Sequence, residues 1–329
     1  MSSPTPTPTP TPITFPSATH TLSGHLYHHP PSPTPSTPNE TPLTPALILS
    51  HPMTGVKEQT TTLYATHLHL AGFTTLTFDA AYQGSSTGTP RGLEDPFQRV
   101  EDIKSAVTYL STSVPGVDTS RIGVVGICAS GGYACFAAAG DVRIKAVATV
   151  SAACVGGMCR CGGVGKELRE DGGVIGMVLE GARGDRNRIH GDGDGEGEEA
   201  PKMFDAEKVL QMVQEGEGDD VDSFFKAAAE YYGTERGRHE RSTQRVPLQS
   251  YDRMVVYDSF AFMRLIAPRP VLMIAGEEAE TLHYSEEAVR LAREPKELFV
   301  VPGMGHFDLY DRLEVSGPKL VRFFREALA

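Results

Sequence analysis

The sequence is short of basic residues. Its 329 residues include 30 Lys and Arg against 42 Asp and Glu, which gives a formal net charge of -12 at pH 7. A protein this acidic is repelled by phosphate backbones and by anionic membrane surfaces. Neither a nucleic acid nor a membrane is therefore an expected partner.

Long apolar runs are also missing. No run reaches the roughly 18 residues that a membrane span needs, and the start MSSPTPTPTPTP has no basic region followed by an apolar stretch. The N-terminus is therefore not expected to be a secretory signal. Alternating Thr-Pro has few backbone donors and nothing to bury, so residues 1–17 are expected to form a disordered leader.

Cysteines are few and odd in number. Five in a chain of this length do not indicate a disulfide framework, and a reducing compartment such as the cytoplasm fits better. Cys154, Cys159 and Cys161 lack the second ligand pair of a zinc site. The stretch from Asp192 begins like a calcium loop, but its twelfth position is Met203 instead of a bidentate Glu. We expect no metal and no other cofactor.

The sequence does contain a series of short apolar runs. They are rich in Val, Ile and Leu, as buried parallel strands are, and they lie at 45–52, 73–80, 121–128, 144–152, 270–277 and 298–303. Residues 20–29 alternate as an edge strand would. Helical patterns separate several of these runs, and Asp95 before Pro96 is a good helix start. This alternation predicts an α/β protein with a doubly wound, mostly parallel sheet.

Residues 155–255 interrupt this rhythm. The charged, Gly-rich stretch 181–202 has little to bury and is expected to be a loop, and two helical patterns follow it. We interpret the block as a lid inserted between two parts of the core, 18–154 and 256–329. Aromatic residues on its second helical pattern could form an apolar wall for a substrate, or could simply pack the lid onto the sheet; they are Phe224, Phe225, Tyr231 and Tyr232.

The stretch RIGVVGICASGG, residues 121–132, presents two candidate nucleophiles, Cys128 and Ser130. In a nucleophile elbow a strand ends in a sharp turn before a helix, and the residues two before and two after the apex must be small. Cys128 at the apex satisfies this through Gly126 and Ser130, and the strand runs directly into it. The dipole of the following helix should then favour its thiolate. The alternative is a small buried cysteine at a strand end.

The partners of a nucleophile in such a fold follow in the order acid, then histidine. His306, after the last apolar run, is the expected base. Three acids compete in the loop after residue 276: Glu277, Glu278 and Glu280. An oxyanion hole needs two backbone N–H groups, and Ala129 would supply one. Because Pro52 has no N–H, Met53 is the expected second donor and Thr54 the fallback.

Five segments together resemble one branch of the α/β-hydrolases; they read SHPMTGVKEQT, FDAAYQGSSTGTPRGLEDPFQRVEDI, GICASGGYA, AGEEAETLHYSEEA and GHFDLYD. The branch includes dienelactone-hydrolase-like bacterial proteins and fungal polyketide transferases or thiohydrolases. The likeness covers roughly residues 18–155 and 250–329. It implies an α/β-hydrolase fold with Cys128 as nucleophile. The family has an Ala-Asp-Thr motif whose Asp is the triad acid, and Glu280 stands at the position of that Asp in this sequence. The resemblance therefore implies Glu280 as the acid.

The resemblance also implies a reaction. It would be acyl transfer from a thioester, such as a polyketide chain on a carrier domain of a polyketide synthase, to water or to an alcohol. A general carboxylesterase or lactone hydrolase on the same fold is an alternative. A non-catalytic binding protein is a third, because a fold does not fix a function.

Overall fold

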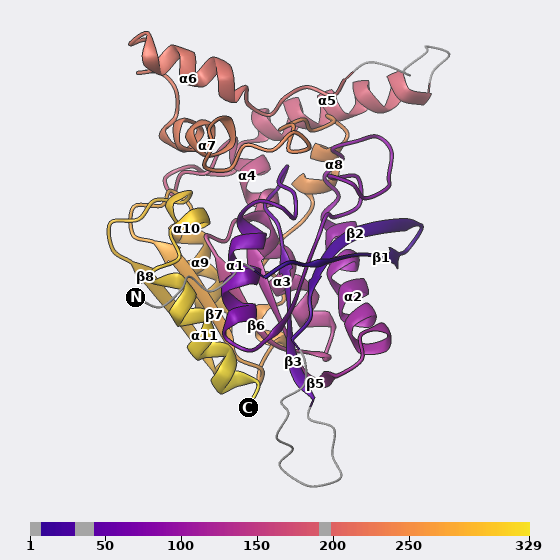
Figure 1. Cartoon of the computed structure of the whole chain (residues 1–329). Coiled ribbons are helices and arrows are strands. Elements are labelled where there is room, and N and C mark those ends of the chain that lie inside the picture. The colour runs from indigo at the N-terminus through magenta and orange to yellow at the C-terminus, as the bar shows by residue number, and fades with distance from the viewer. Residues whose placement is uncertain (1–7, 30–42, 191–198) are drawn as a thin grey trace, which may run out of the picture.

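The computed structural model describes residues 8–29, 43–190 and 199–329. These residues form an eight-stranded sheet in the order β1-β2-β4-β3-β5-β6-β7-β8 (Figure 1). Its strands are β1 (Thr11–Ser17), β2 (His20–Tyr27), β3 (Thr44–Ser50), β4 (Thr74–Phe78), β5 (Val117–Ile127), β6 (Ile144–Val150), β7 (Val271–Gly276) and β8 (Lys296–Val301). The pairs β1–β2 and β2–β4 are antiparallel and the other pairs are parallel, which confirms the expected mostly parallel α/β sheet.

Helices cover both faces of this sheet. On one face lie α1 (Thr60–Leu70) and α11 (Ser316–Ala327), and on the other lie α2 (Pro96–Ser113), α3 (Ala129–Gly140), the short 3₁₀ helix η1 (Met263–Leu265) and α9 (Leu282–Leu291). Successive strand residues serve opposite faces: Leu47 packs toward α1 and α11, and Ile48 toward α2 and α3. The start of α2 is as expected, because the Asp95 carboxylate accepts hydrogen bonds from two backbone N–H groups of its first turn.

The disordered leader was expected to end at residue 17, and this is wrong for residues 11–17, which form β1. Within this outermost strand the side chains of Phe15 and Ser17 are buried, whereas those of Pro12 and Pro16 are exposed. Proline is tolerated there because an edge strand needs no N–H on its open side. As a result β2 is not the edge strand, since β1 covers it. Residues 1–7 of the predicted leader lie outside the described part.

A block of helices between β6 and β7 covers one end of the sheet (Figure 1). Its members are α4 (Val155–Cys161), α5 (Gly172–His190), α6 (Ala206–Gln214), α7 (Ser223–Gly233) and α8 (Ser250–Val255). The loop expected at 181–202 is a helix as far as residue 190. Ala182 in α5 is fully buried, and Arg186 forms an ion pair with Asp252 of α8. The calcium-like stretch 191–198 lies outside the described residues.

Across the ranges that the structure describes, no helix combines the length and the apolar character required to cross a membrane.

Candidate active site

The carboxyl ends of the parallel strands bring the predicted site residues to one end of the sheet. Cys128 follows β5, Thr281 lies in the loop after β7, and His306 follows β8 just before the short helix α10 (Asp308–Asp311). Loops at the carboxyl ends of parallel strands form the usual ligand site of open α/β sheets. The lid helices lie over this same end (Figure 1).

Cys128 occupies the apex of a sharp turn between β5 and α3. Its backbone has φ 57° and ψ -123°, a conformation that costs free energy in a non-glycine residue. The surrounding structure holds it there: the Cys128 N–H donates to Val150 O at 3.0 Å, and its carbonyl accepts from Gly131 and Ala153. A Cβ on Gly126 would lie 2.0 Å from Ser130 O, so only glycine fits at that position. The turn therefore has the geometry expected of a nucleophile elbow.

Ser130, the other candidate nucleophile, is fully buried in a hydrogen-bond network. Its hydroxyl donates to His51 O at 2.6 Å, accepts from Arg99 at 3.1 Å and lies 2.9 Å from Ser50 Oγ. It is not among the residues that line the pocket at Cys128. Ser130 thus serves to hold the turn against the loop after β3.

The predicted oxyanion-hole residues Met53 and Ala129 line the same pocket as Cys128. Arg99 joins the loops that carry them, because its guanidinium donates to His51 O at 2.6 Å as well as to Ser130. Glu94 forms a buried ion pair with this arginine at 3.2 Å. The sequence reasoning did not single out Arg99 or Glu94, although both lie in a segment that carries the family resemblance.

His306 is 2% exposed, and its ring contacts two hydroxyl groups. Its Nδ1 lies 2.6 Å from Thr281 Oγ1, and its Nε2 lies 3.2 Å from the hydroxyl of Tyr310 in α10. Phe224 of the lid packs edge-on against the imidazole, with 5.1 Å between ring centroids. Burial lowers the pKa of His306 to about 3, so the ring is neutral at neutral pH and one of its nitrogens carries a free lone pair.

The expectation that Glu280 orients His306 is wrong in this structure. The Glu280 carboxylate accepts a hydrogen bond from Ser223 Oγ of α7 at 2.6 Å, and the next residue, Thr281, takes the place beside Nδ1. Glu277 and Glu278, the competing acids, are exposed at the start of the loop. The reason is register: Thr281 is buried at 1% exposure, and the longer Glu280 side chain extends toward the lid.

The pocket at Cys128 is small and apolar. Its volume is about 50 Å³, enough for a few water molecules but far below that of a ligand-filled cleft. The lining residues are Met53, Thr54, Cys128, Ala129, Val155, Met158, Met203, Phe204, Phe224, Phe225, Ala228, Tyr232, Phe307 and Tyr310, and none of these carries a formal charge at neutral pH. Three of the four predicted lid aromatics are among them. The fourth, Tyr231, instead packs against Tyr310 and Phe307 outside the pocket.

Cys128 is a half-buried residue that lines this pocket. Burial among apolar groups raises its pKa above the ordinary range, while the Tyr310 hydroxyl and the Ala129 N–H act in the opposite direction. The end of α3 was expected to favour the thiolate, but the net shift is in the opposite direction, because burial disfavours the charged form. The resting pair is a thiol and a neutral imidazole.

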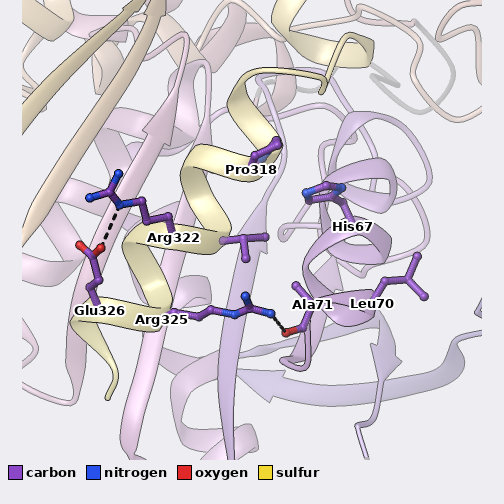
Figure 2. Close-up of a pocket in the computed structure, with 8 residues that line it drawn as sticks. His67, Leu70, Ala71, Pro318, Arg322, Arg325 and Glu326 are labelled. Carbon is purple, nitrogen blue, oxygen red and sulfur yellow. Dashed lines mark hydrogen bonds and ion pairs between the residues drawn. The ribbon is translucent and has the colours of Figure 1, made fainter.

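A larger hollow lies elsewhere, on the outer surface between α1 and α11 (Figure 2). It has a volume of about 710 Å³ and is lined by His67, Leu70, Ala71, Pro318, Val321, Arg322, Arg325 and Glu326. Figure 2 shows Arg325 donating to Ala71 O and Arg322 paired with Glu326. It contains none of the predicted nucleophile, base or oxyanion groups, so the candidate chemistry belongs to the small pocket under the lid.

Comparison with known proteins places the chain in a family. Residues 56–316 match the model of the alpha/beta hydrolase family. The chain belongs to the alpha/beta hydrolase family. This alpha/beta hydrolase is 35% identical over 267 residues to the uncharacterized protein YcjY of Escherichia coli (strain K12). The aligned residues make up 81% of this chain and 82% of that protein.

Two further relatives have solved structures. The hypothetical protein PA2218 from Pseudomonas aeruginosa superposes on this alpha/beta hydrolase with a TM-score of 0.83 at 32% identity, covering 97% of this chain and 94% of that one. The polyketide transferase grgF of Penicillium is 24% identical over 266 residues, or 80% of this chain and 81% of that protein. The crystal structure of GrgF gives a TM-score of 0.72 at 23% identity over 97% of this chain and 99% of that one. The likeness to the fungal polyketide enzymes is therefore distant.

Replacing Thr281 by valine is expected to lower kcat/KM about tenfold. Valine has a similar shape but cannot hold His306 Nδ1, so the ring loses the contact that fixes its tautomer and orientation. Glu280→Gln, which changes the adjacent residue, should stay within about twofold, and Thr281→Ser should restore most of the rate. Steady-state rates on one substrate that the protein hydrolyses test this, and a larger loss in Glu280→Gln than in Thr281→Val would return the acid role to Glu280.

Proposed function

We propose that this protein transfers acyl groups from thioesters, as a thiohydrolase or an acyltransferase, through a thioacyl intermediate on Cys128. The observation that supports this most is the strained Cys128 at the apex of the elbow, facing a pocket that holds both predicted oxyanion donors. A structural cysteine at a strand end needs no positive φ, no adjacent pocket and no histidine network nearby. This combination favours an enzyme over a binding protein.

The reaction follows from the geometry. His306 accepts the proton that leaves the Cys128 thiol, and the sulfur attacks the carbonyl carbon of the substrate. The N–H groups of Met53 and Ala129 stabilise the oxyanion. The C–S bond of the substrate then breaks, and its sulfur departs as a thiol with the proton from His306. His306 then activates water or an alcohol, which takes the acyl group from Cys128. No step requires a cofactor.

Two considerations favour thioesters over oxygen esters, and the pocket lining indicates the kind of acyl chain. A thiol nucleophile exchanges readily with a thioester because the two leaving groups are alike, whereas expelling an alkoxide is harder. The pocket lining is uncharged, which suits a neutral acyl chain rather than a carboxylate. Finally, the similar Penicillium protein is named a polyketide transferase, and an Aspergillus aculeatus protein that is 37% identical over 106 residues is named thiohydrolase aneE. A polyketide chain on a carrier domain is therefore the substrate class we favour.

Matched substrates test this proposal. The purified protein is given a thioester and an oxygen ester with the same acyl chain and leaving groups of similar size, and kcat/KM is measured for each. A preference for the thioester well beyond the difference in uncatalysed hydrolysis is expected. Equal or better turnover of the oxygen ester would favour a carboxylesterase or lactone hydrolase instead.

The lid is expected to select the length of the acyl chain. Phe225 of α7 lines the pocket and packs against Phe204 and Phe224, and the ring pairs of the described residues do not include Phe225 with His306. Because the closed pocket is too small for a long chain, the lid must move and its aromatic rings must contact the chain that enters. Removing one such ring should cost about 1.5 kcal/mol of apolar contact, or about tenfold in kcat/KM on a long chain.

The comparison uses Phe225→Ala on an acetyl and a long-chain thioester, with the melting temperature recorded. The control is Phe97→Ala, the same deletion at a 54% exposed phenylalanine of α2 outside the pocket. The acetyl rate should change by less than about twofold. A parallel loss on both substrates, together with a lower melting temperature, would mean that Phe225 only packs the lid onto the sheet.

A further inference from the structure

The hydroxyl of Tyr310 lies between the candidate nucleophile and the candidate base. It is 3.2 Å from His306 Nε2, and Tyr310 lines the same pocket as Cys128. His306 itself is not among the residues that line this pocket. Tyr310, and not His306, is therefore the member of this pair that lines the pocket at Cys128.

The contacts form one continuous line. Thr281 Oγ1 contacts His306 Nδ1 at 2.6 Å, and His306 Nε2 contacts the Tyr310 hydroxyl at 3.2 Å. Tyr310 lines the same small pocket as Cys128, where its hydroxyl favours the thiolate form of Cys128. Among the hydrogen bonds of the described residues, none joins Cys128 directly to His306. The nucleophile and the base are thus connected through the tyrosine.

We propose that Tyr310 is a catalytic residue that relays the proton between Cys128 and His306. This inference rests on the proposed thioacyl chemistry. As the sulfur attacks the substrate, the S–H bond breaks and its proton moves to Tyr310 Oη, while the Tyr310 O–H proton moves to His306 Nε2. The tyrosine is neutral before and after, and the products of this step are a tetrahedral oxyanion bound to Cys128 and an imidazolium. Collapse of the oxyanion breaks the C–S bond of the substrate, whose sulfur departs as a thiol with the proton from His306 and leaves the thioacyl-enzyme. Thr281 is a positioning residue, since an Nε2 that accepts a proton requires Nδ1–H to donate to Thr281 Oγ1.

The surroundings of Tyr310 favour such a concerted relay. Burial raises the pKa of Tyr310 well above its ordinary value, and the neighbouring Cys128 and Tyr232 act in the same direction. A resting tyrosinate is therefore excluded, and the hydroxyl can pass on a proton only as it receives another. A buried tyrosine usually finds a single partner for its hydroxyl. The Tyr310 hydroxyl instead contacts the base His306, and Tyr310 shares the small pocket with Cys128 and Tyr232.

The test compares Tyr310→Phe with Tyr231→Phe. Tyr231 is a matched control, because its ring packs 4.9 Å from that of Tyr310 while Tyr231 is not among the residues that line the pocket. The single-turnover rate of acylation is measured with an acyl thioester. The rate of Cys128 alkylation by iodoacetamide is followed against pH, and a thermal melt reports folding. Tyr310→Phe should acylate at least tenfold more slowly, and its alkylation profile should shift to higher pH, whereas Tyr231→Phe should match the wild type.

The other outcomes are distinct. Acylation of Tyr310→Phe within twofold of wild type would overturn the relay, and so would equal losses in both variants, which would indicate a packing role. If the wild-type protein turns over the thioester without forming an adduct on Cys128, the proposed thioacyl function fails first. In wild type, a relay of two protons should also give a curved dependence of the acylation rate on the fraction of D2O. Tyr310→Phe should lose that curvature.

Discussion

Replacement of Cys128 by alanine is expected to lower kcat/KM on an acyl thioester by at least about 10³-fold, as loss of a covalent nucleophile does. The fold should survive, because the elbow requires a small residue and alanine is smaller than cysteine. Only the chemistry is removed. Steady-state kinetics and a thermal melt of the same preparation separate these effects.

The control for this prediction is Ser130→Ala. The Ser130 hydroxyl holds the turn through His51 O and Arg99 and does not line the pocket, so its loss should cost about 1–2 kcal/mol of stability and little activity. An inactive Ser130→Ala beside an active Cys128→Ala would mean that the apex has been assigned to the wrong residue.

Replacement of His306 by glutamine is expected to lower kcat/KM by about 10²- to 10³-fold, the range for a lost general base. The pH profile gives a second test. With a pKa of about 3, His306 stays neutral as the pH falls from 7 to 5, so the wild-type rate should show no histidine limb near pH 6.5. The rate should instead rise toward alkaline pH, because burial raises the pKa of the Cys128 thiol.

The same buried histidine makes stability depend on pH. Its pKa is about 6.5 in the unfolded chain and about 3 in the folded one, so between these values the unfolded state binds more protons. The free energy of unfolding should therefore fall as the pH drops below 6.5, by up to about 1.4 kcal/mol per unit from this group. Denaturant titrations at pH 7 and 5 should show a smaller fall in His306→Gln. An equal fall in both proteins would contradict the buried neutral histidine.

The fold could be predicted because its determinants are local. Short runs of Val, Ile and Leu mark the parallel strands, and the pattern of small residues from Gly126 to Gly132 marks a turn that larger side chains would disrupt. Strand β1 was missed because its prolines suggest a disordered leader. Ile13, Phe15 and Ser17 alternate onto the face of β1 that is turned to the protein interior, but over only seven residues this alternation is a weak signal.

The base network could not be predicted because it depends on side-chain register in loops. Glu280 and Thr281 are adjacent in one loop, so a difference of one residue determines which side chain reaches His306. In the structure Glu280 bonds Ser223 of the lid, and Thr281 contacts His306. Tyr310 did offer a signal. It lies four residues after His306, and residues four apart meet on one face of a helical turn.

The central claim is a thioacyl bond to Cys128, and intact-protein mass spectrometry tests it most directly. The protein is mixed with an acyl thioester and quenched in acid within the first turnover, and the mass and the modified peptide are determined. The account predicts a mass increase of one acyl group, placed on Cys128 and absent from Cys128→Ala. An acyl group on Ser130, or turnover with no adduct at any time in the first cycle, would contradict it.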